Sequence, residues 1–248
     1  MADLDLSGRV AFVSGASRGI GAGLAERFLE CGMRLVLCAR GESAIPAGQN
    51  VLARRLDVRD EVALGGLVSE AETRFGGIDL WVNNAGVLDP IEPLRDVSLE
   101  AFREHVDINL TGVFVGSKCY VNHLRRTKRS GVLINMSSGA AWNAYQGWGA
   151  YCAGKAGVER LTEVLALEEK DAGLRAYSVA PGVVDTEMQE KIRATPEARF
   201  PDLPRFLDLK RDDAFNTPRY VADQLLEIAF EPERAKAQVA LRLENEKP

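Results

Sequence analysis

The sequence predicts an α/β fold: a doubly wound parallel sheet of about seven strands with helices on both faces. Three observations support this prediction. Short β-branched runs alternate with longer amphipathic stretches along all 248 residues. A glycine-rich turn directly follows the first of these runs. No shift in composition marks a linker, and no internal repeat is present. We therefore expect one domain with a single Rossmann fold over residues 1–248.

The strands are expected where apolar, β-branched residues run together. The first is RVAFVSG (9–15), a run typical of a strand that is buried on both faces. Parallel strands are joined by right-handed crossovers, and ligands bind at their carboxyl ends. The predicted strands lie at 9–15, 34–39, 50–58, 78–86, 131–138, 174–182 and 237–243.

The helices are expected where apolar residues recur at helical spacing between these strands. The link RGESAIPAGQN, between the second and third strands, leaves little room for a helix. The predicted helices lie at 20–31, 60–75, 98–128, 149–171 and 218–230.

Residues 187–217 break this regular alternation. They contain Pro196, Pro201 and Pro204, mixed charge and only short helical patterns. This composition is typical of a mobile cover over a site rather than of a core element.

Composition excludes several classes of function. The chain is 46% hydrophobic and 27% charged, with a net charge of −5, which disfavours a nucleic-acid surface. No apolar run approaches the ~20 residues that a membrane span requires. The start, MADLDLSGRV, lacks the basic and apolar regions of a secretory signal, so we expect a cytoplasmic protein. Four cysteines without a CxxC pair, and only two histidines, predict no metal site.

The turn SGASRGIG (14–21) has the features of a dinucleotide-binding loop. Its glycines permit a tight turn and a close approach of the backbone to a pyrophosphate, and the helix that follows offers free N–H groups. The alternative is a plain strand–helix turn. The residues expected to contact the coenzyme here are Gly15, Ser17, Arg18, Gly19, Ile20 and Gly21.

The end of the second strand indicates which dinucleotide is bound. An NAD site usually places a carboxylate there, whereas this strand ends in CAR, with Arg40. Arg18 adds a second guanidinium, and two guanidiniums suit a 2′-phosphate, so we expect NADP(H). The alternative is that both arginines are merely solvated. Asp57 is expected to accept from the adenine amino group, and Val58 to pack against the ring.

The stretch GAYCAGKAG (149–157) places Tyr151 and Lys155 about one helical turn apart. A free tyrosine has a pKa near ~10, and a nearby ammonium favours the phenolate, so we expect Lys155 to lower the pKa of Tyr151. On their own, without the coenzyme motifs, the two residues are more typical of a solvated helix face.

Six ordered motifs identify the chain as resembling the short-chain dehydrogenase/reductase family. They are GASRGIG (15–21), NNAG (83–86), INLTG (108–112), INMSS (134–138), YCAGK (151–155) and PGVVDT (181–186). The resemblance implies that Tyr151 donates the proton and that Lys155 binds the nicotinamide ribose. It implies that Ser138, rather than Ser137, binds the carbonyl oxygen, and that Asn109 bends its helix and holds a water.

The same resemblance implies further coenzyme contacts and an assembly. NNAG borders the adenosine ribose, and PGVVDT shapes the nicotinamide pocket. A homodimer or homotetramer is expected, since the helices at 98–128 and 149–171 commonly pair between subunits in this family. The implied contacts are Asn84, Ala85, Gly86, Pro181, Gly182, Val184 and Thr186.

Within the family, YQGWGAYCAGKAG and APGVVDTEMQ look like the sepiapterin reductase and benzil reductase branch. This implies NADPH-dependent reduction of vicinal dicarbonyls, in a pocket with aromatic walls from Trp142, Tyr145 and Trp148. The alternative is that these are ordinary core or surface aromatics. The tail lacks a clear counterpart of the acid that anchors pterins, with Glu244 the nearest. The alternatives to a dicarbonyl substrate are another carbonyl class, such as 3-oxoacyl thioesters, and a non-catalytic NADP(H) sensor.

Overall fold

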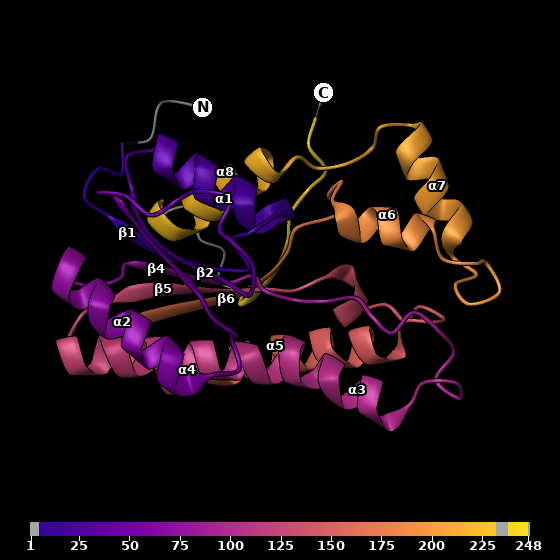
Figure 1. Ribbon diagram of the computed structural model, residues 1–248, viewed down its shortest axis with the longest axis horizontal. Helices are drawn as coiled ribbons and strands as arrows, with labels where there is room; N and C mark the ends of the chain where they lie inside the picture. Colours follow the sequence, from indigo (N-terminus) through magenta and orange to yellow (C-terminus); the bar gives the residue numbers. More distant parts are fainter. Residues whose placement is uncertain (1–4, 232–237, 248) are drawn as a thin grey trace.

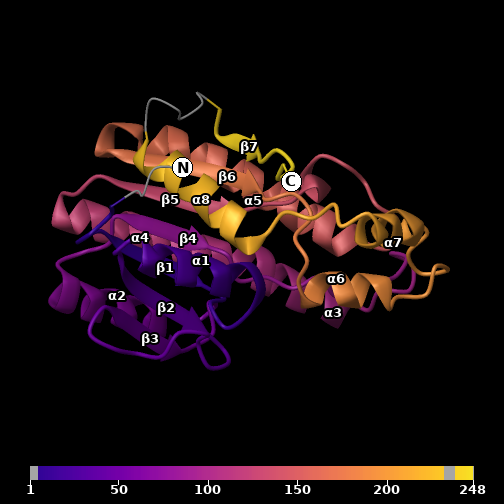
Figure 2. The same cartoon turned by 90° about the horizontal axis from the view of Figure 1, so that it is seen from above.

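The computed structural model describes residues 5–231 and 238–247. Within them, seven strands form one parallel sheet in the order β3-β2-β1-β4-β5-β6-β7 (Figures 1 and 2). The order reverses beside β1, which is the switch point where ligands bind in such sheets. The strands are β1 Val10–Ser14, β2 Arg34–Ala39, β3 Val51–Arg55, β4 Leu80–Asn83, β5 Gly131–Met136, β6 Leu174–Ala180 and β7 Ala240–Arg242.

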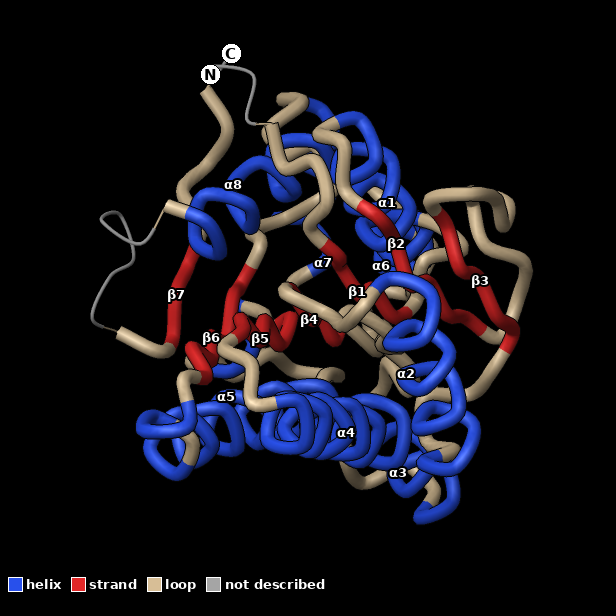
Figure 3. The backbone as a smooth tube through the Cα atoms, turned by 90° about the vertical axis from the view of Figure 1, so that its left-hand side faces the viewer, coloured by secondary structure: helices blue, strands red, loops and turns tan. Residues whose placement is uncertain are grey.

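Helices cover both faces of the sheet (Figure 3). α1 and α8 pack together on one face, while α2, α4 and α5 cover the other. Each face has its own buried apolar cluster, because the β-branched runs present side chains to both sides. The helices are α1 Gly19–Glu30, α2 Glu61–Phe75, α3 Leu99–Val106, α4 Gly112–Thr127, α5 Gly149–Glu168, α6 Glu187–Arg193, α7 Leu203–Arg211 and α8 Pro218–Phe230.

This architecture confirms the predicted fold class, but the long helix expected at 98–128 is interrupted. A π-helical turn, Asp107–Thr111, separates α3 from α4. Such bulges often occur at functional sites. The cause here is Asn109, whose side-chain amide turns away from the helix and bonds to the backbone of Val87.

Several strands are shorter than expected. β3 ends at Arg55, so Asp57 and Val58 lie in the turn before α2 rather than in the strand. The link at 40–50 contains no helix, as its length indicated. The last strand, expected at 237–243, spans Ala240–Arg242, and residue 237 lies outside the described residues.

Residues 187–217 form α6, α7 and connecting turns beyond the carboxyl ends of the strands (Figure 1). We call this segment the lid. It packs through a third apolar cluster that includes Trp148, Phe200 and Phe206. The predicted short helices are therefore present, while the mobility of the lid remains a prediction. None of the helices in the described residues has the length and apolar character needed to cross a membrane.

Candidate active site

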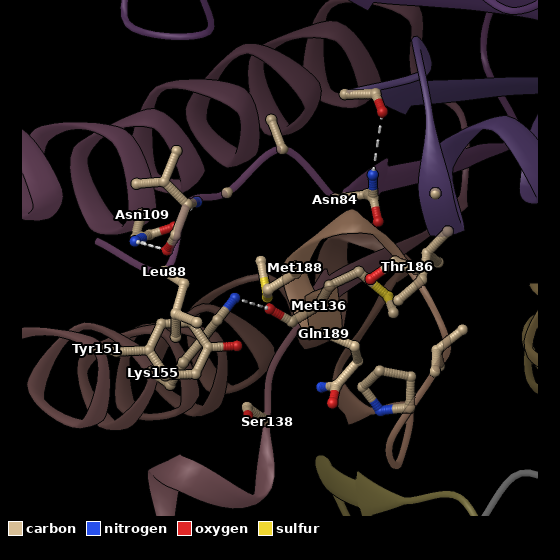
Figure 4. A pocket seen from close by; sticks show the side chains of 18 of the residues that line it. Asn84, Leu88, Asn109, Met136, Ser138, Tyr151, Lys155, Thr186, Met188 and Gln189 are labelled. Carbon is tan, nitrogen blue, oxygen red and sulfur yellow. Dashed lines mark hydrogen bonds between the residues drawn. The ribbon is translucent and has the colours of Figure 1, made fainter. Parts of the chain in front are cut away.

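A cavity of about 1270 Å³ runs along the carboxyl ends of the strands and under the lid. Of the residues expected to bind the coenzyme or the substrate or to act in catalysis, all except Trp142 line it; Figure 4 shows part of this lining. At the expected coenzyme end they are Gly15, Ser17, Arg18, Gly19, Ile20, Gly21, Arg40, Asp57, Val58, Asn84, Ala85, Gly86, Pro181, Gly182, Val184 and Thr186. At the expected reacting end they are Asn109, Ser138, Tyr145, Trp148, Tyr151 and Lys155.

The glycine loop forms a cradle that side chains would fill. Gly15 has a φ of +70°, and a Cβ there would lie 2.8 Å from the Cα of Ala85. A Cβ on Gly21 would lie 2.2 Å from the carbonyl oxygen of Gly15. Arg18 precedes α1 without capping it through its side chain, and the first residues of α1, Gly19 to Gly21, line the cavity. The loop therefore has the shape and polarity that a pyrophosphate requires.

The segment after β4 is held against this loop by Ser14 and Asn84. The hydroxyl of Ser14 accepts from the backbone N–H groups of Asn84 and Ala85, at 3.0 and 3.1 Å. The side chain of Asn84 donates to the carbonyl of Ser14 at 3.0 Å. Asn84 thus acts mainly on the backbone of the neighbouring strand, which fixes the width of the cavity.

The polar groups of the adenine end are partly engaged with one another. Arg18 forms an ion pair with Glu187, the first residue of α6. Both carboxylate oxygens of Asp57 accept from Arg59, at 2.9 and 2.6 Å, and this lowers the pKa of Asp57. Arg40 is exposed on the cavity rim. The expected adenine acceptor is therefore already paired, whereas Arg40 faces solvent.

At the reacting end, α5 places Tyr151 and Lys155 on one face, buried against the sheet. Nζ of Lys155 donates to the carbonyl of Met136 at 2.7 Å and lies 5.7 Å from the centre of the Tyr151 ring. Ser138 follows β5, and its hydroxyl accepts from the N–H of Ala140 at 3.2 Å. Tyr151, Lys155 and Ser138 converge on the same part of the cavity (Figure 4).

The expectation for the pKa of Tyr151 is wrong in this structure. Burial raises that pKa above its usual value, and a hydrogen bond with Ser138 only partly offsets the rise. Lys155 does not contribute to this shift: its ammonium donates to the carbonyl of Met136, and burial lowers its own pKa to about 8. Spacing along a helix indicated the proximity of the two residues but not this balance of burial against charge.

Asn109 projects from the π-helical turn and is held on three sides. Its Oδ1 accepts from the N–H of Val87 at 2.9 Å, and its Nδ2 donates to the carbonyl of Val87 at 2.8 Å. Nδ2 also lies 2.8 Å from Nε2 of His105, a buried residue that sequence reasoning missed. His105 is four residues before Asn109, so helical spacing was an available signal.

The far end of the cavity is aromatic. Trp148 stacks on Phe200 of the lid with ring centres 4.7 Å apart and also contacts Tyr145 and Phe206. The hydroxyl of Tyr145 accepts from Arg205 at 3.1 Å. The Trp142 prediction is wrong: this side chain is outside the cavity lining and 44% exposed. Its indole N–H donates to Glu159 of α5 at 2.7 Å, which turns the ring away from the site.

Several lining residues were not predicted. Met188, Gln189 and Ile192 come from α6, and Arg242 comes from the end of β7. The lid pattern gave no indication of which faces of its short helices point inward. Glu244 is not among the residues that line the cavity, so the nearest candidate for an acidic anchor lies outside it.

Comparison with known proteins relates this site to a large group of enzymes. The sequence model of the family described as short chain dehydrogenase matches residues 9–197. A 3beta-hydroxysteroid dehydrogenase 1 from Eggerthella lenta is 38% identical over 204 residues, covering 79% of this chain and 78% of its own. A benzil reductase ((S)-benzoin forming) from Bacillus cereus is 35% identical over 227 residues, covering 86% of this chain and 91% of its own.

A solved structure supports the same relation. The crystal structure of the KRED1-Pglu enzyme is 32% identical and superposes with a TM-score of 0.80, covering 89% of this chain and 94% of that one. The residues matched by the family model, 9–197, include the glycine loop, the segment after β4 and the Tyr151–Lys155 helix.

Proposed function

Because this chain belongs to the short-chain dehydrogenase family, we propose that it uses NADPH to reduce a carbonyl to an alcohol, with vicinal diketones or related aryl ketones as substrates. As a family member it is an oxidoreductase that acts on carbonyl or CH–OH groups. The observation that carries the proposal is the convergence of Ser138, Tyr151 and Lys155 beside the glycine loop in one cavity.

The chemistry divides between the coenzyme and the chain. A reduced nicotinamide, when bound, supplies the hydride that the carbonyl carbon accepts. The hydroxyls of Ser138 and Tyr151 donate hydrogen bonds to the carbonyl oxygen, which stabilises the negative charge that develops there. Tyr151 then transfers its proton to that oxygen, so the carbonyl gains one hydride and one proton and becomes an alcohol.

The raised pKa of Tyr151 is compatible with this direction of reaction. A buried phenol stays protonated at neutral pH, which is the form that donates. An alkoxide is a far stronger base than a phenolate, so the proton transfer is favourable as the alkoxide forms. Lys155 holds its ammonium between the carbonyl of Met136 and the cavity, where it can bind ribose hydroxyls.

The preference for NADP(H) is supported by Arg40. Its guanidinium lies at the rim after β2, where an NAD enzyme usually carries a carboxylate. Arg18 contributes a second positive charge to the same cavity and also holds Glu187 of the lid. A 2′-phosphate would bind these guanidiniums with charge-assisted hydrogen bonds.

The substrate class is supported by the aromatic wall and by the similarity to benzil reductases. Tyr145, Trp148 and Phe206 line a pocket end suited to an aryl group. At the end of β7, Arg242 rather than an acid lines the cavity. The absence of a protein carboxylate at this position of the cavity lining argues against a pterin anchored by such a group and favours a neutral ketone.

The proposal is tested by following NADPH oxidation with three substrate classes: an aryl diketone, a pterin and a 3-oxoacyl thioester. We expect the diketone to be reduced and Tyr151→Phe to lower its kcat by at least a hundredfold. Turnover of the thioester alone would support the other carbonyl class. Turnover of none, with NADPH still bound, would support a sensor instead.

We also propose that the chain assembles through α4 and α5. Phe114 of α4 and Val164 and Leu167 of α5 are apolar and exposed, on the face of these helices away from the sheet. Exposed apolar residues of this size often mark contacts between subunits. Sedimentation velocity would reveal a dimer or tetramer, and Leu167→Glu should shift it toward the monomer.

A further inference from the structure

Gln189 is a buried polar residue whose side chain is not accounted for by the fold. It lies on α6, and only 8% of it is exposed. Its backbone N–H donates to the carbonyl of Thr186 at 2.8 Å, as the first turn of a helix requires. Its side-chain Oε1, however, is buried and has no hydrogen-bond partner among the described residues. An unpartnered buried amide oxygen is costly, so a ligand that supplies a donor would be favoured there.

The surroundings of Gln189 locate that ligand. The amide points from α6 toward the side of the cavity where Tyr151 and Ser138 lie (Figure 4). Its apolar neighbours in the wall are Met188 and Ile192. The charged α6 residues of the same wall, Glu187 and Lys191, are already paired with Arg18 and Asp89, so the unpartnered polar atom that α6 contributes is Oε1 of Gln189. A group that reaches Gln189 therefore belongs to the substrate and lies close to the carbonyl that reacts.

We infer that Gln189 binds the second oxygen of a substrate with two adjacent oxygen-bearing carbons, while Ser138 and Tyr151 bind the first. This inference rests on the proposed function and narrows its substrate class to vicinal diketones and hydroxyketones.

A side-chain amide can bind both the diketone substrate and the hydroxyketone product of such a reaction. Nε2 donates to the second carbonyl of a diketone, and Oε1 accepts from the hydroxyl of a hydroxyketone. A site built around such a bond discriminates against an analogue that lacks the second oxygen, because the amide is then buried unpaired.

The test compares benzil with deoxybenzoin, which has a methylene in place of the second carbonyl. Gln189→Met keeps the length of the side chain and removes both hydrogen-bonding groups. We expect the ratio of kcat/KM for benzil to that for deoxybenzoin to fall about tenfold in this variant. Gln224→Met is the matched control: Gln224 lies on α8, bonds to Glu227, and is outside the cavity lining, so the ratio should stay as in the wild type.

A second variant keeps the test decisive if methionine disturbs the lid. Gln189→Glu retains acceptors and loses the donor, so its benzil preference should fall as well, while benzoin oxidation with NADP⁺ should be affected less. Equal losses on benzil and deoxybenzoin, or no change in the ratio in either variant, would overturn the role of Gln189 and leave the proposed function intact. Failure of the wild type to reduce either ketone would overturn both.

Discussion

Nδ2 of Asn109 lies 2.8 Å from Nε2 of His105, within the bend between α3 and α4. Because an amide nitrogen only donates, Nε2 must accept, and the ring proton must be on Nδ1. That nitrogen lies 2.5 Å from the carbonyl of Asp89, which accepts it. The two residues therefore fix each other: a neutral His105 orients the amide of Asn109 at the edge of the cavity.

The first prediction concerns the stability of this pair toward acid. Burial lowers the pKa of His105 below 6.5, and the nearby ammonium of Lys155 acts in the same direction. The unfolded chain takes up the proton first, so the free energy of unfolding should fall as pH drops below about 6.5. His105→Gln keeps an acceptor for Asn109 but does not titrate, so its urea-unfolding stability should depend less on pH between about 7 and 5. If the free energy of unfolding depended on pH in the same way in the wild type and in His105→Gln, the prediction would be contradicted.

The sequence predicted those parts of the site that depend on neighbours in the chain. The glycine loop and the Tyr151–Lys155 spacing are local patterns, and each implies its geometry. The bend at Asn109 depends instead on the backbone of Val87, more than twenty residues away in the sequence. No pattern within the helix alone determines that contact.

The direction of side chains was the least predictable feature. Trp142 and Trp148 are six residues apart in one stretch, yet one faces solvent and the other the lid. A short 3-10 turn at Gly139–Ala141 and the bond to Glu159 decide this difference. Likewise, the pKa of Tyr151 depends on how completely the fold buries it, which the sequence did not determine.

The second prediction is that the ammonium of Lys155 reduces stability at neutral pH. Its pKa falls from 10.5 to about 8 on burial, a shift that corresponds to about 3 kcal/mol. Lys155→Met removes this cost and loses the hydrogen bond to Met136, so we expect a gain of about 1–2 kcal/mol in the free energy of unfolding at pH 7. Activity should nevertheless fall by about a hundredfold or more.

The sign of the pH dependence provides the check. The unfolded chain keeps the lysine proton up to about pH 10.5, whereas the folded chain releases it near pH 8. Wild-type stability should therefore rise over that interval relative to Lys155→Met, and the difference between the two proteins should narrow. Lys118→Met, at an exposed lysine paired with Glu61, should give no gain. A less stable Lys155→Met protein at pH 7 would refute this argument.

The third prediction concerns coenzyme choice. Arg40→Ser removes the exposed guanidinium at the rim. Charge-assisted bonds to a phosphate are worth about 1.5–3 kcal/mol, so KM for NADPH should rise about 10- to 100-fold, with KM for NADH nearly unchanged. The measurement is initial-rate kinetics with both coenzymes. Arg54→Ser, on β3 and paired with Glu70, is the matched control. Equal increases in KM for NADPH and for NADH would mean that Arg40 does not bind the 2′-phosphate.

The fourth prediction contrasts the two tryptophans. Trp148 is 5% exposed and stacks between the body of the protein and Phe200 of the lid. Trp148→Ala leaves a cavity in the third apolar cluster, so we expect a loss of about 3–5 kcal/mol in the free energy of unfolding. Trp142→Ala removes an exposed ring and one hydrogen bond to Glu159, and it should cost about 1 kcal/mol or less.

Limited proteolysis separates a loosened lid from general destabilisation. If Trp148 anchors the lid, Trp148→Ala should be cut within residues 187–217 well before the body of the protein unfolds, because local opening there needs less free energy than global unfolding. Trp142→Ala should give the wild-type pattern of fragments. Early cleavage in both variants, or in neither, would show that the stack of Trp148 on Phe200 does not hold the lid closed.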